Sequence, residues 1–211
     1  MMRSLFYVAA VATLSLSACA DAVTPDAQPR APETGHAAEL PGDKPIYALR
    51  DSIYTSQTPS EFLDAAPGWQ VATRFIPDYD GKFTGYRFYK APGETGSHTA
   101  RLYTTSGFPV HQITFPAETP SGWQRVTFTT AVYGYAGEEY YITVNTNSKQ
   151  AKTPAYFNNN GPIFRSWGAA YGGAYGQPIH AFPSSGSGSS FFVDVYYRAL
   201  LCSETITENC R

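Results

Sequence analysis

The sequence predicts an all-β domain, built as a two-sheet β-sandwich of jelly-roll type with about eight strands. Three observations favour this fold class. The chain has 16 Tyr, 13 Phe and 3 Trp but only 2 Met, a composition typical of extracellular β domains. Apolar and polar residues alternate over short stretches, and Gly- and Pro-rich turns separate these stretches. No convincing amphipathic helical pattern lies between them, and a barrel is the structural alternative.

The stretch from Thr73 to Thr105 determines this prediction. Two alternating segments, Gly81–Lys90 and His98–Thr104, lie on either side of a turn over Ala91–Ser97. Side chains on a strand alternate between its two faces, so each segment presents an aromatic-rich face that another sheet must cover. The turn contains two glycines and a proline, which argue against a helix here.

Eight candidate strands follow one another at short intervals. Apolar pairs such as Val126 and Phe128, or Ile142 and Val144, sit two residues apart, which is the period of a half-buried strand. The expected strands are Ser52–Ser56, Gln70–Ile76, Gly81–Lys90, His98–Thr104, Val110–Phe115, Gln124–Thr130, Tyr140–Asn145 and Phe191–Arg198.

The first 18 residues predict a secretory signal. Arg3 precedes an apolar run over Leu5–Leu16, which is too short to span a bilayer comfortably. The sequence Leu-Ser-Ala-Cys that ends at Cys19 resembles the lipobox of bacterial lipoproteins, which implies that Cys19 is acylated after cleavage. The alternative is an ordinary signal peptide with a chance cysteine. Ala20 rather than Asp follows the cysteine, and by resemblance to Gram-negative sorting this favours the outer membrane.

Residues 19–45 predict a disordered tether between the lipid and the folded domain. This segment contains five prolines and almost no bulky apolar side chains, so it cannot bury enough surface to offset its ordering entropy. We therefore expect an extracytoplasmic protein of the bacterial cell envelope, attached to the membrane through its N-terminal lipid. The β-sandwich is expected over residues 46–200, and a tail over residues 201–211.

The charge balance excludes one class of partner. The whole chain has a formal net charge of −2, and removal of the leader with Arg3 makes it one charge more negative. A nucleic-acid-binding protein usually has an excess of basic residues, whereas this chain has 15 basic and 17 acidic residues.

Several sequence blocks resemble an uncharacterised bacterial family, the domain-of-unknown-function family four-zero-eight-two. The blocks are SIYTSQTP at Ser52–Pro59, TRF at Thr73–Phe75, DYDGKFTGYRFYK at Asp78–Lys90, TGSHTARLYTTSG at Thr95–Gly107, ETPSGWQRVTF at Glu118–Phe128 and VDV at Val193–Val195. The resemblance implies a β-sandwich of secreted and surface proteins and no established reaction. The chain departs from the pattern at Glu94, at Ala131 and over Asn145–Asn147.

The segment Tyr156–Ser190 is the first candidate binding site, because long structured loops on a sandwich commonly carry function. Flat rings and amides suit a sugar, which presents both C–H faces and hydroxyl groups. The expected stacking residues are Trp167, Tyr171 and Tyr175, and the expected hydrogen-bonding residues are Asn158, Asn159, Asn160 and Gln177. The alternative is that these rings fold back and cap the sandwich.

Two further sets of side chains deserve a chemical interpretation. Asp78 and Asp80 stand at alternate positions before a glycine, as Ca²⁺ ligands do, although an Asp-Gly turn needs no metal. His98, His111 and His180 are each interpreted as packing residues rather than as ligands or bases. We expect no other cofactor.

Catalytic signatures are absent from the sequence. It contains no nucleophile elbow, no zinc-protease motif and no phosphate-binding loop. A glycan-active enzyme needs only two carboxylates, and Glu94, Glu118 and Asp194 keep this alternative open. We therefore predict a non-catalytic surface module that binds a glycan or a partner protein, with a structural envelope component as the alternative.

The last two cysteines, Cys202 and Cys210, are expected to form a disulfide. They stand close together in the tail, and an oxidising compartment outside the cytosol favours their pairing.

Overall fold

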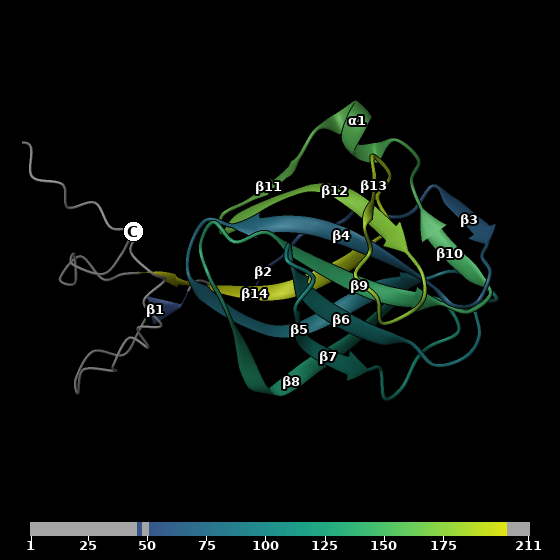
Figure 1. Ribbon diagram of the computed structural model, residues 1–211, viewed down its shortest axis with the longest axis horizontal. Coiled ribbons are helices and arrows are strands. Elements are labelled where there is room, and N and C mark those ends of the chain that lie inside the picture. The colour runs from purple at the N-terminus through teal and green to yellow at the C-terminus, as the bar shows by residue number, and fades with distance from the viewer. Residues whose placement is uncertain (1–45, 48–50, 202–211) are drawn as a thin grey trace, which may run out of the picture. The chain divides into compact units, whose positions relative to one another are not determined.

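The computed structural model describes residues 46–47 and 51–201, which form an all-β domain with one short helix (Figure 1). The elements in chain order are β1 (Ile46–Tyr47), β2 (Asp51–Ser52), β3 (Glu61–Asp64), β4 (Trp69–Pro77), β5 (Gly81–Lys90), β6 (Thr99–Thr104), β7 (Pro109–Thr114), β8 (Gly122–Gly134), β9 (Tyr140–Thr146), β10 (Lys149–Lys152), α1 (Tyr156–Asn160), β11 (Ile163–Arg165), β12 (Gly168–Gly176), β13 (Ser185–Ser187) and β14 (Val193–Leu201). The predicted fold class is confirmed.

Two antiparallel sheets make up the sandwich. The first sheet has the order β1–β14–β5–β8, with β2 also paired to β14, and the second has the order β11–β12–β4–β9–β6–β7, with β13 paired to β12. β3 and β10 to β13 are additions to a basic set of eight strands, in which β1 and β2 together count as the first. The first strand then lies beside the eighth, β14, and the second strand, β4, lies beside the seventh, β9, as in a jelly roll. Among the described strands none pairs across from one sheet to the other, so the sheets do not close into a barrel.

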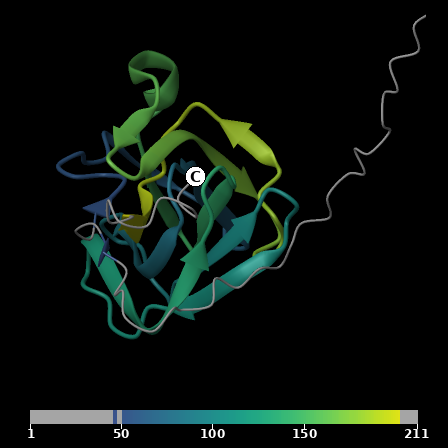
Figure 2. The ribbon, with the colours of Figure 1, turned by 90° about the vertical axis from the view of Figure 1, so that its left-hand side faces the viewer.

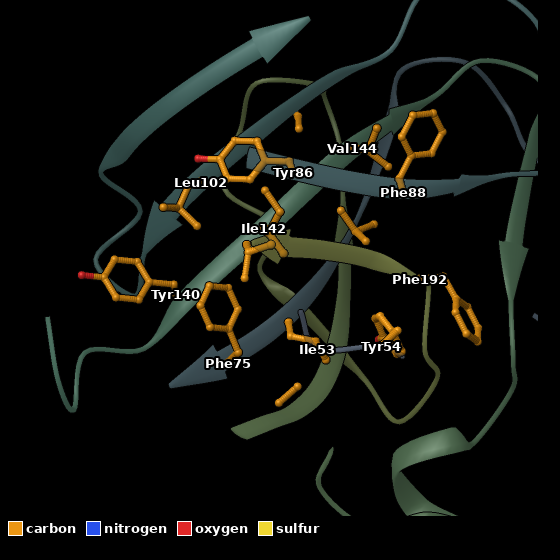
Figure 3. Close-up of a cluster of buried hydrophobic side chains, with 14 of the residues drawn as sticks. Ile53, Tyr54, Phe75, Tyr86, Phe88, Leu102, Tyr140, Ile142, Val144 and Phe192 are labelled. Carbon is orange, nitrogen blue, oxygen red and sulfur yellow. The ribbon is translucent and has the colours of Figure 1, made fainter. Parts of the chain in front are cut away.

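The core lies between the sheets and consists mainly of aromatic and β-branched side chains (Figure 3). Phe75 from β4 packs edge-on against Phe83 from β5, with ring centroids 5.9 Å apart. Ile142 and Val195 are fully buried on the facing strands β9 and β14. Each square ångström of apolar surface removed from water contributes about 25 cal/mol, so this contact between the sheets is the main source of stability.

The Gly-rich turn predicted between the two central strands carries the chain from one sheet to the other. β5 pairs with β14 and β8, whereas β6 pairs with β9 and β7. Gly93 and Gly96 have φ angles of 79° and 78°, a left-handed conformation that glycine adopts without strain.

The structure corrects the prediction of a single long loop over Tyr156–Ser190. This segment contains α1, which stands out from the sandwich, and the strands β11, β12 and β13 (Figures 1 and 2). Glycine and alanine fill seven of the nine positions of β12, sequence GAAYGGAYG, which concealed its strand character. Small residues are required there because a Cβ atom at Gly173 would lie 2.3 Å from the carbonyl oxygen of Ser189.

The chain after β12 folds over the outside of the second sheet, and we call residues 177–184 the strap. Gln70 on β4 donates to the carbonyl oxygen of Ala181, and the Tyr103 hydroxyl on β6 donates to that of His180 at 3.1 Å. The ring of Phe182 lies 4.7 Å from that of Tyr141 on β9. This part of the segment therefore covers the outer face of the second sheet.

A buried ion pair joins the first and last strands to the middle of the first sheet. Asp194 on β14 is completely buried, and its carboxylate accepts hydrogen bonds from Arg87 Nε at 2.8 Å and from the backbone N–H groups of Ile53 and Tyr54 at 2.7 and 3.1 Å. Arg87 also donates to the Ser52 hydroxyl at 2.8 Å. The N-terminal segment is thus held to the sheet by charge-assisted bonds rather than by β2 alone, which is shorter than the predicted strand Ser52–Ser56.

Asp194→Asn removes the negative charge and leaves the Arg87 guanidinium buried without a counterion. We expect the free energy of unfolding to fall by about 3 to 5 kcal/mol, measured by urea denaturation with tryptophan fluorescence. Asp64→Asn is the control, because Asp64 pairs with Lys149 at 2.6 Å while remaining 91% exposed, and it should leave the midpoint unchanged. Equal losses in the two variants would contradict the role of Asp194.

Candidate functional site

Three aromatic rings form a row, and we call Phe62, Tyr89 and Trp123 the aromatic row. Tyr89 and Trp123 lie on the outer face of the first sheet, and Phe62 lies on β3, which pairs with β10 in a separate two-stranded sheet. The Phe62 ring on β3 is stacked on the Tyr89 ring of β5, with centroids 6.1 Å apart and an interplanar angle of 22°. Tyr89 meets Trp123 of β8 edge-on at 5.6 Å. Phe62 is 45% exposed, and the other two rings are partly exposed.

The strand register explains why these rings share one face. Tyr89 is the direct cross-strand partner of Trp123, and Arg87 is that of Arg125. The alternate residues of β5, such as Tyr86 and Phe88, point into the core instead. The outer face of β5 and β8 therefore presents aromatic and cationic groups side by side.

The Arg87 guanidinium packs against the aromatic row at Trp123. Its guanidinium carbon lies 4.1 Å from the centroid of the Trp123 ring and 5.7 Å from that of Tyr196, and it is held by Asp194 at 2.7 Å. Cation–π contacts of this kind orient the indole plane, and the ion pair fixes the arginine. Trp123 is therefore pre-oriented, and little conformational entropy is lost when a ligand stacks on it.

The aromatic row was not among the residues predicted from the sequence. Tyr89 was assigned to the predicted strand Gly81–Lys90 without a binding role, and Trp123 and Phe62 lay outside every predicted strand. The signal was present in the alternation of β5, where Arg87 and Tyr89 stand on the face opposite to Tyr86 and Phe88. The pairing of this face with Trp123 depends on the register of β8, which the sequence pattern does not specify.

The sequence-predicted stacking residues are not brought together. The prediction was wrong for Trp167, which is only 2% exposed and packs against the rings of Phe75 and Tyr197 at 6.0 and 5.0 Å. Tyr171 and Tyr175 are 42% and 39% exposed on β12, and the Tyr175 ring lies 6.0 Å from that of Trp69. These two tyrosines remain available at the surface.

The predicted amide groups lie in two different places. Asn158, Asn159 and Asn160 form the exposed part of α1, and the Asn160 amide donates to the Tyr156 carbonyl oxygen at 2.8 Å. Gln177 is exposed at the start of the strap.

The two aspartates predicted as calcium ligands lie in the turn between β4 and β5. Asp80 accepts a hydrogen bond from the backbone N–H of Ala136 at 2.7 Å, which joins this turn to the one between β8 and β9. Asp78 is exposed. In the described part of the chain, no three His, Cys, Asp or Glu side chains are grouped so as to hold a metal ion. Calcium binding here remains a prediction.

His98 belongs to a buried chain of charged groups rather than standing alone. Its Nε2 lies 2.9 Å from Glu94 Oε1, and its Nδ1 lies 2.8 Å from Glu118 Oε2, while Lys90 Nζ donates to Glu118 at 2.8 Å. The imidazole therefore links the two carboxylates, one at each of its ring nitrogens, and Lys90 supplies a positive charge beside Glu118.

The Glu94 carboxylate joins this chain to the turn between β9 and β10. It accepts hydrogen bonds from the backbone N–H groups of Asn147 at 2.8 Å, Ser148 at 3.0 Å and Lys149, and from the Ser148 hydroxyl at 2.8 Å. Burial by itself raises the pKa of Glu94, but these donors together with His98 lower it below its ordinary value. Glu94 therefore acts as a structural acceptor for a turn.

Comparison with known families assigns the domain. A family model described as a domain of unknown function (DUF4082) matches residues 56–193. The chain belongs to this family. No curated protein matches the sequence. The DUF4082 match covers the strands from β3 to β13, which include the aromatic row and the strap, and it ends at the first residue of β14.

Several predictions for the DUF4082 chain fall outside the described residues. They are the signal peptide over residues 1–18, the lipidation of Cys19, the tether over residues 19–45, and the disulfide between Cys202 and Cys210. Within the described part of the chain, no helix is long and apolar enough to cross a bilayer.

The Glu94 network makes stability depend on pH. Since the pKa of Glu94 is lower in the folded than in the unfolded chain, the unfolded chain takes up the proton first as the pH falls. The stabilisation is therefore complete above the ordinary carboxyl pKa of about 4.3 and is lost as the pH falls through the folded value. We expect the difference in free energy of unfolding between wild type and Glu94→Gln to be largest near about pH 6 and to shrink on acidification.

Urea denaturation at a series of pH values checks this expectation. Glu138→Gln is the control, because Glu138 is exposed and should give a difference that hardly changes with pH. A gap between wild type and Glu94→Gln that widens as the pH falls would contradict the role of Glu94.

Proposed function

We propose that this DUF4082 domain is a non-catalytic surface module that binds glycans through the aromatic row. It would act outside the cytosol, held at the cell envelope by lipid on Cys19. The observation that carries the proposal is the contiguous, partly exposed set of rings from β5 and β8 of the first sheet and from β3 beside them.

The chemistry of the aromatic row suits a sugar. A pyranose ring has one face of C–H groups, which pack on the electron-rich face of Tyr or Trp, and a rim of hydroxyl groups that need polar partners. The side chain of Arg125 is exposed next to Trp123 on the same face of β8, and Thr127 follows it. Flat rings with donors at their side match this combination of apolar face and polar rim.

The burial of two carboxylates argues against the alternative of a glycan-active enzyme. A glycosidase needs one carboxyl group that donates a proton and a second that attacks or activates water. Asp194 is completely buried and committed to Arg87, and Glu94 is saturated by donors from the turn and from His98. A structural envelope component remains the alternative function, and it predicts that no glycan binds.

Binding to the aromatic row is tested with the mature chain carrying Cys19→Ser, which removes the lipid, on a glycan array. Phe62→Ala and Tyr89→Ala should each weaken binding by about 1 kcal/mol, which is roughly fivefold, because each removes one stacking ring. Isothermal titration with the best array ligand measures the change.

The matched control is Phe164→Ala, since Phe164 is 70% exposed but lies on β11 in the other sheet. It should bind as the parent does. A loss of binding in the double variant Tyr171→Ala, Tyr175→Ala, with none in Phe62→Ala or Tyr89→Ala, would move the site to β12 and refute the aromatic row. Absence of any array signal would favour the structural alternative.

A further inference from the structure

Arg101 on β6 is a buried arginine without an acidic partner. Its side chain is only 6% exposed, and its Nε donates to Gln112 Oε1 on the neighbouring strand β7 at 3.1 Å. Among the described residues, no hydrogen bond or ion pair engages its two terminal nitrogens. The other strongly buried arginine, Arg87, is neutralised by Asp194 at 2.7 Å. The charge of Arg101 is therefore uncompensated within the described domain.

The terminal nitrogens of Arg101 keep contact with solvent, since neither is among the fully buried polar atoms without a partner in the described part of the chain. Burial of the rest of the side chain lowers the pKa of Arg101, yet a guanidinium stays protonated in proteins at neutral pH. Thr143 beside it is completely buried, and the Tyr103 hydroxyl donates to the carbonyl oxygen of His180 at 3.1 Å. An anion from solvent can therefore reach a positive charge that no carboxylate of the described domain neutralises.

The strap brings a second basic group to the same place. Arg101 and Tyr103 stand two residues apart on β6, and the Tyr103 hydroxyl donates to the carbonyl oxygen of His180 at 3.1 Å, so the strap passes close to Arg101 at His180. The His180 side chain is exposed, and its pKa is lowered first by desolvation and then by the positive charge of Arg101. His180 has a φ angle of 86°, a left-handed conformation that residues other than glycine rarely adopt. Two contacts hold the strap on the second sheet: the Phe182 ring packs against Tyr141 of β9, and Gln70 of β4 donates a hydrogen bond to the carbonyl oxygen of Ala181. Strained residues held by their surroundings are frequent at binding sites.

We propose that Arg101 and His180 form a binding site for the oxyanion group of a ligand, with a carboxylate as the best fit. Because Gln112 takes Nε, the two terminal nitrogens of Arg101 are left to bind both oxygens of a carboxylate end-on. The imidazole of His180 supplies a third donor from the strap. This site is separate from the aromatic row, because β6 and the strap belong to the second sheet, whereas β5 and β8 belong to the first.

The site is tested on the full mature chain carrying Cys19→Ser by NMR, with acetate and sulfate as probes. The signals followed are the arginine Nε–H groups and the backbone amides of the strap, and sodium chloride keeps the ionic strength constant. We expect a saturable shift of the Arg101 Nε–H signal and of the amides near His180. Acetate tests a planar carboxylate, and sulfate tests a tetrahedral oxyanion.

Three variants separate binding from folding. Arg101→Lys keeps the charge but loses the two-pronged donor, so acetate binding should weaken about tenfold or more. His180→Gly keeps the left-handed backbone at no steric cost, so the thermal midpoint should not fall while binding weakens several-fold. Arg74→Gln is the matched control on the same sheet, because Arg74 is already paired with Glu139 at 2.7 Å, and it should leave binding unchanged.

Saturation by either probe that depends on Arg101 supports an oxyanion site, and the preferred probe identifies its geometry. The proposal is overturned if neither probe gives a saturable shift, or if the shift persists undiminished in Arg101→Lys and His180→Gly. Equal weakening in Arg74→Gln would also overturn it, since binding would then follow the general charge of the face.

Discussion

The buried carboxylate of Asp194 is the constraint on which much of this domain depends. It lies on the last strand, binds Arg87 of the strand beside it, and accepts the N–H groups of Ile53 and Tyr54 from the start of the domain. In a jelly roll the first strand closes against the last, and this closure is made by few residues. Here β2 has only two residues, and the charge-assisted bonds of Asp194 supplement its short ladder.

The same ion pair connects stability with the proposed function. Arg87 is held by Asp194 on one side and lies under Trp123 on the other. A ring on a sheet surface can change its side-chain rotamer unless a neighbouring group packs against it. The Arg87 guanidinium packs against the Trp123 indole and restricts this motion. The chain of groups formed by Lys90, Glu118, His98 and Glu94 performs a comparable task at the crossing between the sheets, where it holds the turn after β9. Polar networks of this kind stabilise a unique arrangement only when every member is satisfied.

The sequence allowed the fold class and most strands to be predicted, because alternation and turn residues act locally. β4, β5, β6 and β9 all appear close to their expected bounds. β12 was missed because its glycines and alanines are selected by close contact with other chain segments, such as Gly173 against Ser189, and not by strand propensity. The aromatic row was missed for a related reason. Its members are distant in sequence, and only strand register brings Tyr89 opposite Trp123.

The pairing of β1 with the end of β14 has a consequence for how the domain is presented. Ile46 lies opposite Leu201, so the chain enters and leaves the sandwich at one end, whereas β3 and β10 lie at the other (Figure 1). Phe62 is carried by β3. The strand that carries this ring therefore lies at the end of the domain opposite to the one at which β1 pairs with the end of β14, so a contact made there leaves the entering and leaving strands untouched.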